Sequence, residues 1–414
     1  MTTLDRDYDL TLYGATGFTG KLVAEYLAKS APGPLRIALA GRDRKKLEGV
    51  RETIAAAHPR ARVYPLVVAD SNDDEALHTL AEDTKVVATT VGPFAKYGSK
   101  LVVACAAAGT DYCDLTGEAP WIRKMIAAHG ETARLSGARI VHSCGFDSIP
   151  SDIGVRVVAD LANSRGLALT EVRYVVAKMR GGMSGGTVAS MMFLGESLRA
   201  DPKLEKVLAD PYSLDPEDGP RGLDGKDPTG VTFIDELGAW SAPFFMGAIN
   251  TRIVRRSNAL LGHRYGRSFR YEERMALGPG PAGAIAASGV AAFLALSQAS
   301  LKAGLTPYAR RWMPAPGEGP SPESRARGFF DIRIYAKTET ATGERGPNLE
   351  GRVSAKGDPG YAATAMMISE AAICLAQGEA EETRGGSWTP ASCLGEPLVT
   401  RLRRAGMTIS AAAV

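Results

Sequence analysis

The chain has 414 residues, of which 45% are hydrophobic and 23% charged, and its formal net charge is +3. This length allows two domains, or one large domain with an insertion, and the hydrophobic content excludes a wholly disordered chain. The nearly balanced charge argues against a dedicated nucleic-acid binder. Five cysteines without a C-x-x-C pair and five scattered histidines predict no metal site and a reducing, cytoplasmic compartment. The charged N-terminus predicts no secretory signal.

The first half of the chain alternates between strand-like and helix-like segments. Short apolar runs lie at 8–13, 35–40, 63–68, 85–91 and 139–143, and helical spacing of apolar residues occurs at 21–29 and 99–108. Strands that are each followed by a helix indicate a parallel sheet covered on both faces. We therefore expect a doubly wound α/β domain over residues 1–155.

A glycine-rich turn joins the first strand of this domain to its helix. The turn has the pattern G-x-x-G-x-x-G and consists of Gly14, Ala15, Thr16, Gly17, Phe18, Thr19 and Gly20. Such a turn lets a pyrophosphate approach backbone N–H groups and the positive end of the helix. In its strand–turn–helix context it predicts a Rossmann-type, dinucleotide-binding domain, although a tight turn without a ligand has the same pattern.

The end of the second strand indicates which dinucleotide is bound. An NAD-selective site usually places an acidic residue there to bind the ribose 2′-hydroxyl. This chain has Gly41 and Arg42 instead, and a guanidinium matches the 2′-phosphate of NADP(H). Asp43 is the nearest acid, and we expect it to cap the next helix. The predicted cofactor is therefore NADP(H).

Two further segments follow strands of the same sheet. Asp70 comes after the third strand, where it either contacts the adenine or caps the next helix. Gly92 and Pro93 follow the fourth strand at the carboxyl edge, where an open α/β sheet binds its ligand. We expect these two residues to border the nicotinamide ribose.

The second half of the chain has a different pattern. Residues 171–179, 269–277 and 329–340 alternate like strands with one exposed face, whereas the proline-rich stretch 200–230 is predicted to be irregular. We expect an α+β substrate domain over 156–387, and a C-terminal segment, 388–414, that packs back on the first domain. Tyr174 and Lys178 match a Tyr-x-x-x-Lys motif, but in a strand these residues lie ~13 Å apart, which argues against a catalytic pair.

Residues 282–301 form a long uncharged segment that is rich in alanine, glycine and serine. It is long enough to span a bilayer, which needs ~20 apolar residues. We favour a buried or substrate-lining helix, with a helix that rests on a membrane as the alternative and a true span as the least expected outcome. Peripheral membrane contact is therefore a hypothesis for this segment.

Several motifs together resemble the saccharopine dehydrogenase-like oxidoreductases. They are LYGATGFTGKL, ALAGRDRKKL, TTVGPFAKYG, AAGTDYCDLTGE, SCGFDSIPSD and TRIVRRSNAL. Within this group the chain is most similar to the trans-acting enoyl reductase branch of mycobacterial lipid pathways, through about residue 155 and again near 245–280 and 388–398. The resemblance implies NADPH as cofactor and an enoyl group, carried on the acyl carrier of a polyketide synthase, as substrate.

Reduction of an enoyl thioester needs an oxyanion donor and a proton source beside the nicotinamide. Tyr97, after the fourth strand, is the candidate donor, and its alternative is a packed tyrosine that bonds a nearby carbonyl. Asp147, after the sixth strand, either orients a proton donor or caps the helix that begins near Pro150, which we slightly favour. We expect Cys144 to be a small buried residue and not a nucleophile.

Residues 251–274 hold seven arginines and only two acidic residues. Arg252, Arg255 and Arg256 either belong to a solvated face with ion pairs to the acidic stretch 201–227 or dock the acidic helix of an acyl carrier protein. Two other functions are kept open. One is a saccharopine-type dehydrogenase acting on an amino-acid imine, and the other is a lipid-associated protein that binds NADPH without catalysis.

Overall fold

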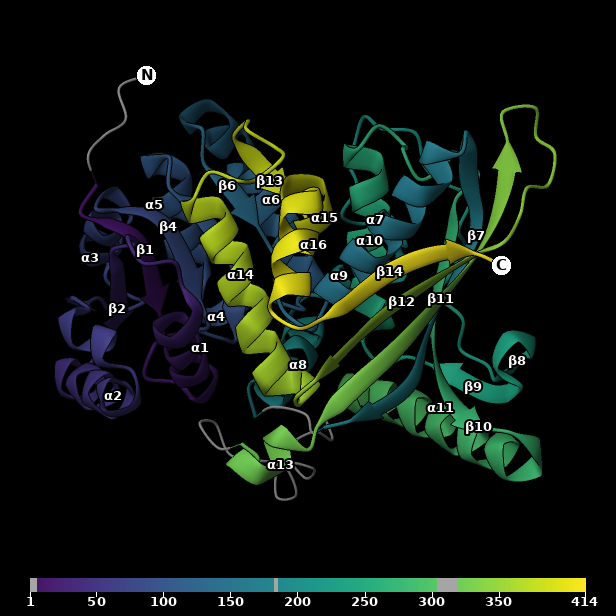
Figure 1. Ribbon diagram of the computed structural model, residues 1–414, viewed down its shortest axis with the longest axis horizontal. Helices are drawn as coiled ribbons and strands as arrows, with labels where there is room; N and C mark the ends of the chain where they lie inside the picture. Colours follow the sequence, from purple (N-terminus) through teal and green to yellow (C-terminus); the bar gives the residue numbers. More distant parts are fainter. Residues whose placement is uncertain (1–5, 182–184, 304–318) are drawn as a thin grey trace.

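The structure is a computed structural model that describes residues 6–181, 185–303 and 319–414, and these form two sheets side by side (Figure 1). The first sheet is parallel throughout, with the order β13-β6-β5-β4-β1-β2-β3. Its strands are β1 (Tyr8–Tyr13), β2 (Ile37–Gly41), β3 (Leu66–Val68), β4 (Thr84–Thr89), β5 (Asp111–Cys113), β6 (Arg139–Val141) and β13 (Gly386–Trp388). The predicted Rossmann-type sheet is confirmed, and its order reverses between β1 and β4, where such sheets bind dinucleotides.

Helices cover both faces of the first sheet. They are α1 (Phe18–Ser30), α2 (Arg44–Ala57), α3 (Asp74–Glu82), α4 (Phe94–Tyr97), α5 (Ser99–Ala108), α6 (Ala119–Ser136) and α14 (Thr364–Ala376), with a short 3₁₀ segment at Pro59–Val63. Helices α1 and α14 pack together on one face, and α3, α5 and α6 follow one another on the other. Apolar residues at helical spacing, such as Val23 and Leu27 of α1, supply the buried contacts.

The second sheet is mixed and has the order β14-β12-β11-β7-β10-β9-β8. Its strands are β7 (Leu167–Arg180), β8 (Thr232–Ile234), β9 (Ala239–Pro243), β10 (Arg270–Gly278), β11 (Phe329–Thr340), β12 (Leu349–Lys356) and β14 (Thr408–Ala413). Only β7 and β10 run parallel to each other. Strand β11 alternates between buried and more exposed positions along most of its length, which confirms the one-faced pattern expected for 329–340. Tyr174 and Lys178 both lie in β7, so the exclusion of a catalytic pair is confirmed as well.

The remaining helices pack around the second sheet and between the two sheets (Figure 1). They are α7 (Ile149–Ser164), α8 (Gly185–Ala200), α9 (Leu204–Ala209), α10 (Gly247–Leu260), α11 (Gly280–Ala303), α13 (Pro322–Ala326), α15 (Pro390–Cys393) and α16 (Gly395–Arg404), with a short 3₁₀ helix at Asp235–Leu237 and a short π-helix at Pro359–Ala363. Helix α7 lies close against the sheet, since a Cβ at Gly154 would be 2.7 Å from Ile334 Cδ1.

The C-terminal part of the chain contributes to both sheets. Strand β13 extends the first sheet by pairing with β6, whereas β14 extends the second sheet by pairing with β12. Helix α14 also packs against β4 and β5 of the first sheet. The contacts between the two halves are therefore extensive, and the division at residues 155 and 387 stays a prediction.

Helix α11 corrects the expectation for the uncharged segment. Over Gly280–Ser300 only 11% of the residues in its most apolar window are buried, so the buried-helix interpretation of 282–301 is wrong. Ile285, Phe293 and Leu296 are each at least two-thirds exposed. By length and composition the helix could cross a membrane, as could Pro359–Ala376, which is 83% buried and serves as a core helix.

Candidate active site

The glycine-rich turn has the backbone geometry that a bound pyrophosphate requires. Gly14 adopts φ +91°, and a Cβ there would lie 2.6 Å from Val91 Cγ2. A Cβ at Gly20 would collide with the Gly14 carbonyl, so α1 can approach β1 only with glycine at that position. The N-terminus of α1 begins after Gly17 without a side-chain cap or an acidic residue in its first turn. Its N–H groups are therefore left to bind an anion.

The charged residues that follow β2 differ in whether their side chains already have partners. Asp43 is the N-cap of α2, where its carboxylate accepts a hydrogen bond from Lys46 N at 3.1 Å, as predicted. Arg44 pairs with Glu48 at 3.2 Å. Arg42 is exposed and forms no ion pair within the described residues. A cation, and not an acid, is thus available where the ribose 2′ position of a dinucleotide lies.

Asp70 does not cap the helix that follows it. Its carboxylate accepts hydrogen bonds from the backbone and side-chain nitrogens of Asn72, at 2.9 and 3.0 Å. The cap of α3 is Asp73, which accepts from Ala76 N. The capping alternative for Asp70 is therefore wrong, and contact with the adenine stays a prediction.

The segment after β4 packs against the glycine-rich turn and leads into α4. Thr90 donates a hydrogen bond from its hydroxyl to the Gly14 carbonyl at 3.2 Å, and the Gly92–Pro93 peptide is cis. The carboxylate of Glu118 accepts the N–H groups of Phe94 and Ala95, at 2.9 and 2.8 Å, and so caps α4. The contact with Gly14 brings this segment to the cofactor turn, and a place for Gly92 and Pro93 beside the nicotinamide ribose stays a prediction.

Glu118 joins this segment to the second half of the molecule. It is 6% exposed, and burial raises its pKa, although Ser190 of α8 donates a hydrogen bond to it at 2.7 Å. The acid follows β5 at the carboxyl edge of the sheet, which was a signal that it shapes the site. The hydrogen bonds from the amides of α4 to Glu118 were not predicted, because the sequence does not show which backbone amides lie near this carboxylate.

Tyr97, at the end of α4, has a partly buried ring and a hydroxyl without a hydrogen bond among the described residues. Lys96 Nζ lies 5.0 Å from the centre of this ring. The alternative in which the Tyr97 hydroxyl bonds a nearby carbonyl is therefore not what the structure has. The hydroxyl is free to bind a ligand.

Asp147 lies after β6 on the same edge of the sheet. A Cβ at Gly145 would be 3.2 Å from Asp147 Oδ2, and one at Gly117 would be 3.9 Å from Oδ1. Burial raises the pKa of Asp147 to about 7, against the opposing effect of its own backbone N–H. No side chain caps α7, whose N-cap Ser148 donates instead to Asn250 Oδ1 at 3.1 Å. The capping role expected for Asp147 is therefore wrong.

A buried polar cluster supports this edge of the sheet. Asp114 is fully buried and accepts hydrogen bonds from Tyr112 OH, His142 Nδ1 and Ser143 N at 2.7–3.0 Å. His142 Nε2 is buried and has no partner within the described residues. Cys144 is fully buried, as expected, and burial raises the pKa of its thiol.

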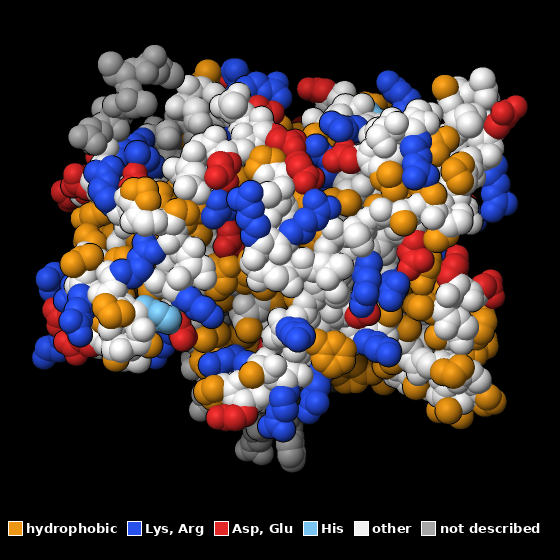
Figure 2. All heavy atoms as spheres, viewed as in Figure 1, with side chains coloured by type: hydrophobic (Ala, Val, Ile, Leu, Met, Phe, Trp, Pro, Cys, Tyr) orange, Lys and Arg blue, Asp and Glu red, His pale blue; other side chains and the backbone are white. Residues whose placement is uncertain are grey.

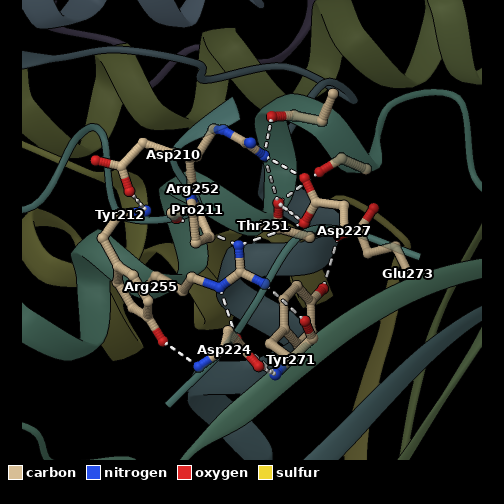
Figure 3. A network of polar contacts seen from close by, with 12 residues as sticks. Asp210, Pro211, Tyr212, Asp224, Asp227, Thr251, Arg252, Arg255, Tyr271 and Glu273 are labelled. Carbon is tan, nitrogen blue, oxygen red and sulfur yellow. Dashed lines mark hydrogen bonds and ion pairs between the residues drawn. The ribbon is translucent and has the colours of Figure 1, made fainter. Parts of the chain in front are cut away.

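The arginines of α10 do not form a docking surface. Arg252, Arg255 and Arg256 are 2–4% exposed. Figure 3 shows that Arg255 reaches Asp224, at 2.6 Å, and that the neighbouring Arg252 pairs with Asp227 at the same distance. The third of these arginines, Arg256, donates to the carbonyls of Leu214 and Ser387. The hypothesis that these residues dock a carrier is wrong, and so is the expectation of a solvated face, because all three are buried. Ion pairing with the stretch 201–227 is confirmed for Arg252 and Arg255.

Comparison with known proteins agrees with the geometry. The family model "Saccharopine dehydrogenase NADP binding domain" matches residues 10–141. A saccharopine dehydrogenase (L-Glu forming) from Saccharomyces cerevisiae aligns with a TM-score of 0.57 at 12% identity, over 98% of this chain and 99% of that chain. At that identity the likeness shows the fold alone. The protein is thus an NADP(H)-dependent oxidoreductase of the saccharopine dehydrogenase-like fold.

Full-length relatives place the chain more narrowly. The trans-acting enoyl reductase of Mycobacterium ulcerans is 39% identical over 430 residues, which cover 99% of both chains. A protein of Mycobacterium tuberculosis that carries the same name provisionally is 42% identical over 422 residues, 99% of this chain and 98% of that one. The chain belongs to the trans-acting enoyl reductase family.

The residues present fit the cofactor. The turn leaves the N-terminus of α1 without a side-chain cap, and its close approach to Val91 and within the turn requires glycine at 14 and 20. Arg42 follows β2 and has no ion pair within the described residues. Among the described residues, no group of three or more histidine, cysteine or acidic side chains is placed to hold a metal ion.

Proposed function

We propose that this protein uses NADPH to reduce the double bond of a lipid-like enoyl thioester carried on an acyl carrier protein, in the synthesis of a polyketide-derived lipid. The observation that carries this proposal is that Tyr97, whose hydroxyl has no hydrogen bond among the described residues, follows β4, while Asp147, whose carboxyl has a raised pKa, follows β6 at the same edge of the sheet. The loop after β5 links them, because Glu118 binds the amides of α4 while Gly117 lies near Asp147.

The two side chains suit the two demands of the reaction. NADPH, when bound, supplies the hydride that reaches the β-carbon of the enoyl group. The hydroxyl of Tyr97 donates a hydrogen bond to the thioester oxygen as negative charge develops there. Asp147, whose pKa is raised by burial to about 7, then gives its proton to the α-carbon or orients the group that does. The segment 92–97 is held in place by Glu118, so the tyrosine is preorganised.

The alternative of a saccharopine-type dehydrogenase is less well supported. An amino-acid imine with several carboxylates needs free arginines in the site. Arg252 and Arg255 already bind Asp227 and Asp224, and the guanidinium of Arg256 is taken by backbone carbonyls.

Steady-state assays with NADPH test the proposal. We expect NADPH oxidation with enoyl thioesters and a saturated thioester product, and no oxidation with an imine formed from glutamate and an aldehyde. Turnover of the imine alone would support the dehydrogenase. If NADPH binds but no substrate of either class is reduced, the non-catalytic alternative is favoured.

A further inference from the structure

A cluster of cations surrounds an exposed phenylalanine on the second sheet. Phe329 of β11 pairs directly with Arg180 of β7 on one side and with Lys356 of β12 on the other. Lys178 is the register partner of Asp331 between strands β7 and β11, two positions along the same face. Directly paired residues share a face of a sheet. Phe329 is 37% exposed, whereas the next residue along the strand is buried, so this row faces solvent.

These cations are not neutralised within the described part of the chain. Asp331 is the acid in the same rows, and its two oxygens are taken by Arg352, at 3.0 and 2.9 Å. Lys178, Arg180 and Lys356 are exposed and have no ion pair there.

Arg327, two residues before Phe329, adds a fourth exposed cation. It donates from Nε to the backbone carbonyl of Glu323, and the carboxylate of Glu323 is the acidic group on the adjoining α13. We call Lys178, Arg180, Arg327 and Lys356 the β11 cation cluster. Its four positive charges outnumber the acid beside it.

The cluster adjoins the cofactor-binding turn. The guanidinium of Arg325, on α13, lies 5.4 Å from the ring centre of Phe18, the residue that begins α1. The same ring packs edge-on against Tyr361 at 4.8 Å, a few residues beyond the end of β12. Figure 2 shows lysine and arginine side chains gathered between α13 and the lower ends of β11 and β12. A partner bound here would sit next to the glycine-rich turn.

We propose that the β11 cation cluster docks the acidic face of the acyl carrier protein that delivers the enoyl group. This inference rests on the proposed function and supplies the docking surface that α10 does not. An exposed aromatic side chain with charged residues around it has the composition of a transient protein interface. Four exposed cations without an ion pair in the described part of the chain would also steer an acidic partner toward the site.

The test compares two double variants of equal charge change. Arg180→Glu with Lys356→Glu reverses the cluster, and Lys124→Glu with Arg404→Glu reverses two exposed cations of α6 and α16 that have no ion pair in the described residues. The substrates are a 2-octenoyl group on the phosphopantetheine of an acidic acyl carrier protein and the same group on N-acetylcysteamine. At low salt we expect kcat/KM for the carrier-bound substrate to fall about tenfold in the cluster variant only. The loss should shrink at high salt, and the carrier-free substrate should be unaffected.

Other outcomes would overturn the proposal. Equal losses on both substrates would mean that the cluster supports the fold or the pocket, and the alanine double variant with a thermal melt checks the fold separately. No loss in the cluster variant would refute docking at this surface. If the wild-type protein reduces neither substrate, the proposed function fails, but fluorescence anisotropy of the labelled carrier still measures docking. Binding to anionic vesicles in place of the carrier, lost in the cluster variant, would mean that a lipid surface is the partner.

Discussion

Replacing Arg42 with alanine should remove the preference for NADPH over NADH. The residue is exposed, follows β2 and has no ion pair in the described residues, whereas the carboxylate of the neighbouring Asp43 is engaged in capping α2. A charge-assisted bidentate contact with a phosphate contributes ~1.5–3 kcal/mol, which corresponds to about 10- to 150-fold in affinity. Because water screens an exposed cation, we expect the wild-type preference to be near the lower end, about tenfold.

Fluorescence titration of the wild type and of Arg42→Ala with both cofactors measures this difference. Arg44→Ala is the matched control, because it removes a positive charge from the same helix start that is already paired with Glu48. The control should keep its preference for NADPH, and Arg42→Ala should bind NADH as the wild type does. Equal affinities of the wild type for both cofactors, or an equal effect of both substitutions, would refute the assignment of the 2′-phosphate to Arg42.

Three further predictions concern the proton donor, the oxyanion donor and the exposed helix. Tyr97→Phe should lower kcat by ~10²–10³ and leave NADPH affinity unchanged, and a variant that keeps more than half its rate would reduce Tyr97 to packing. Since its raised pKa keeps Asp147 protonated only below about pH 7, kcat should fall as pH rises through 7, and Asp147→Asn should abolish that limb of the pH profile. If α11 contacts a membrane peripherally, the wild type should float with lipid vesicles and Phe293→Asp should not. The control Leu135→Asp, at an equally exposed position on α6, should still float. Flotation unaffected by Phe293→Asp would exclude that contact.

The cofactor-binding part of the fold was predictable because its signals are local. A strand, three glycines and a helix lie within the first thirty residues, and a positive φ at Gly14 and a tight approach at Gly20 are geometries that glycine alone permits without cost. The strand at 329–340 was likewise predictable from its alternation. The pairing of β13 with β6, which lie far apart in the sequence, carries no such local signal.

The errors in the candidate site arise where the environment is built by distant residues. The arginine-rich sequence of α10 suggests a charged surface. Arg255 is nevertheless buried, because Asp224 and Tyr271, which lie 31 and 16 residues away, supply its hydrogen-bond partners. The uncharged segment 282–301 of α11 suggests a buried helix, yet most of its surface faces outward. Asp147 precedes a helix and so suggests a cap, but the structure leaves its carboxyl partly buried and uncapped. Charge and hydropathy do not reveal which distant segments cover a helix.

The measurement that tests the account most directly is the fate of the hydride. The protein is incubated with NADPH that carries deuterium at nicotinamide C4 and with a 2-enoyl thioester, and the product is examined by mass spectrometry and NMR. We predict a saturated thioester with one deuterium at its β-carbon and a solvent-derived proton at its α-carbon. Deuterium at the carbonyl carbon, or NADPH that stays unoxidised while bound, would contradict the assignment of this protein as an enoyl thioester reductase.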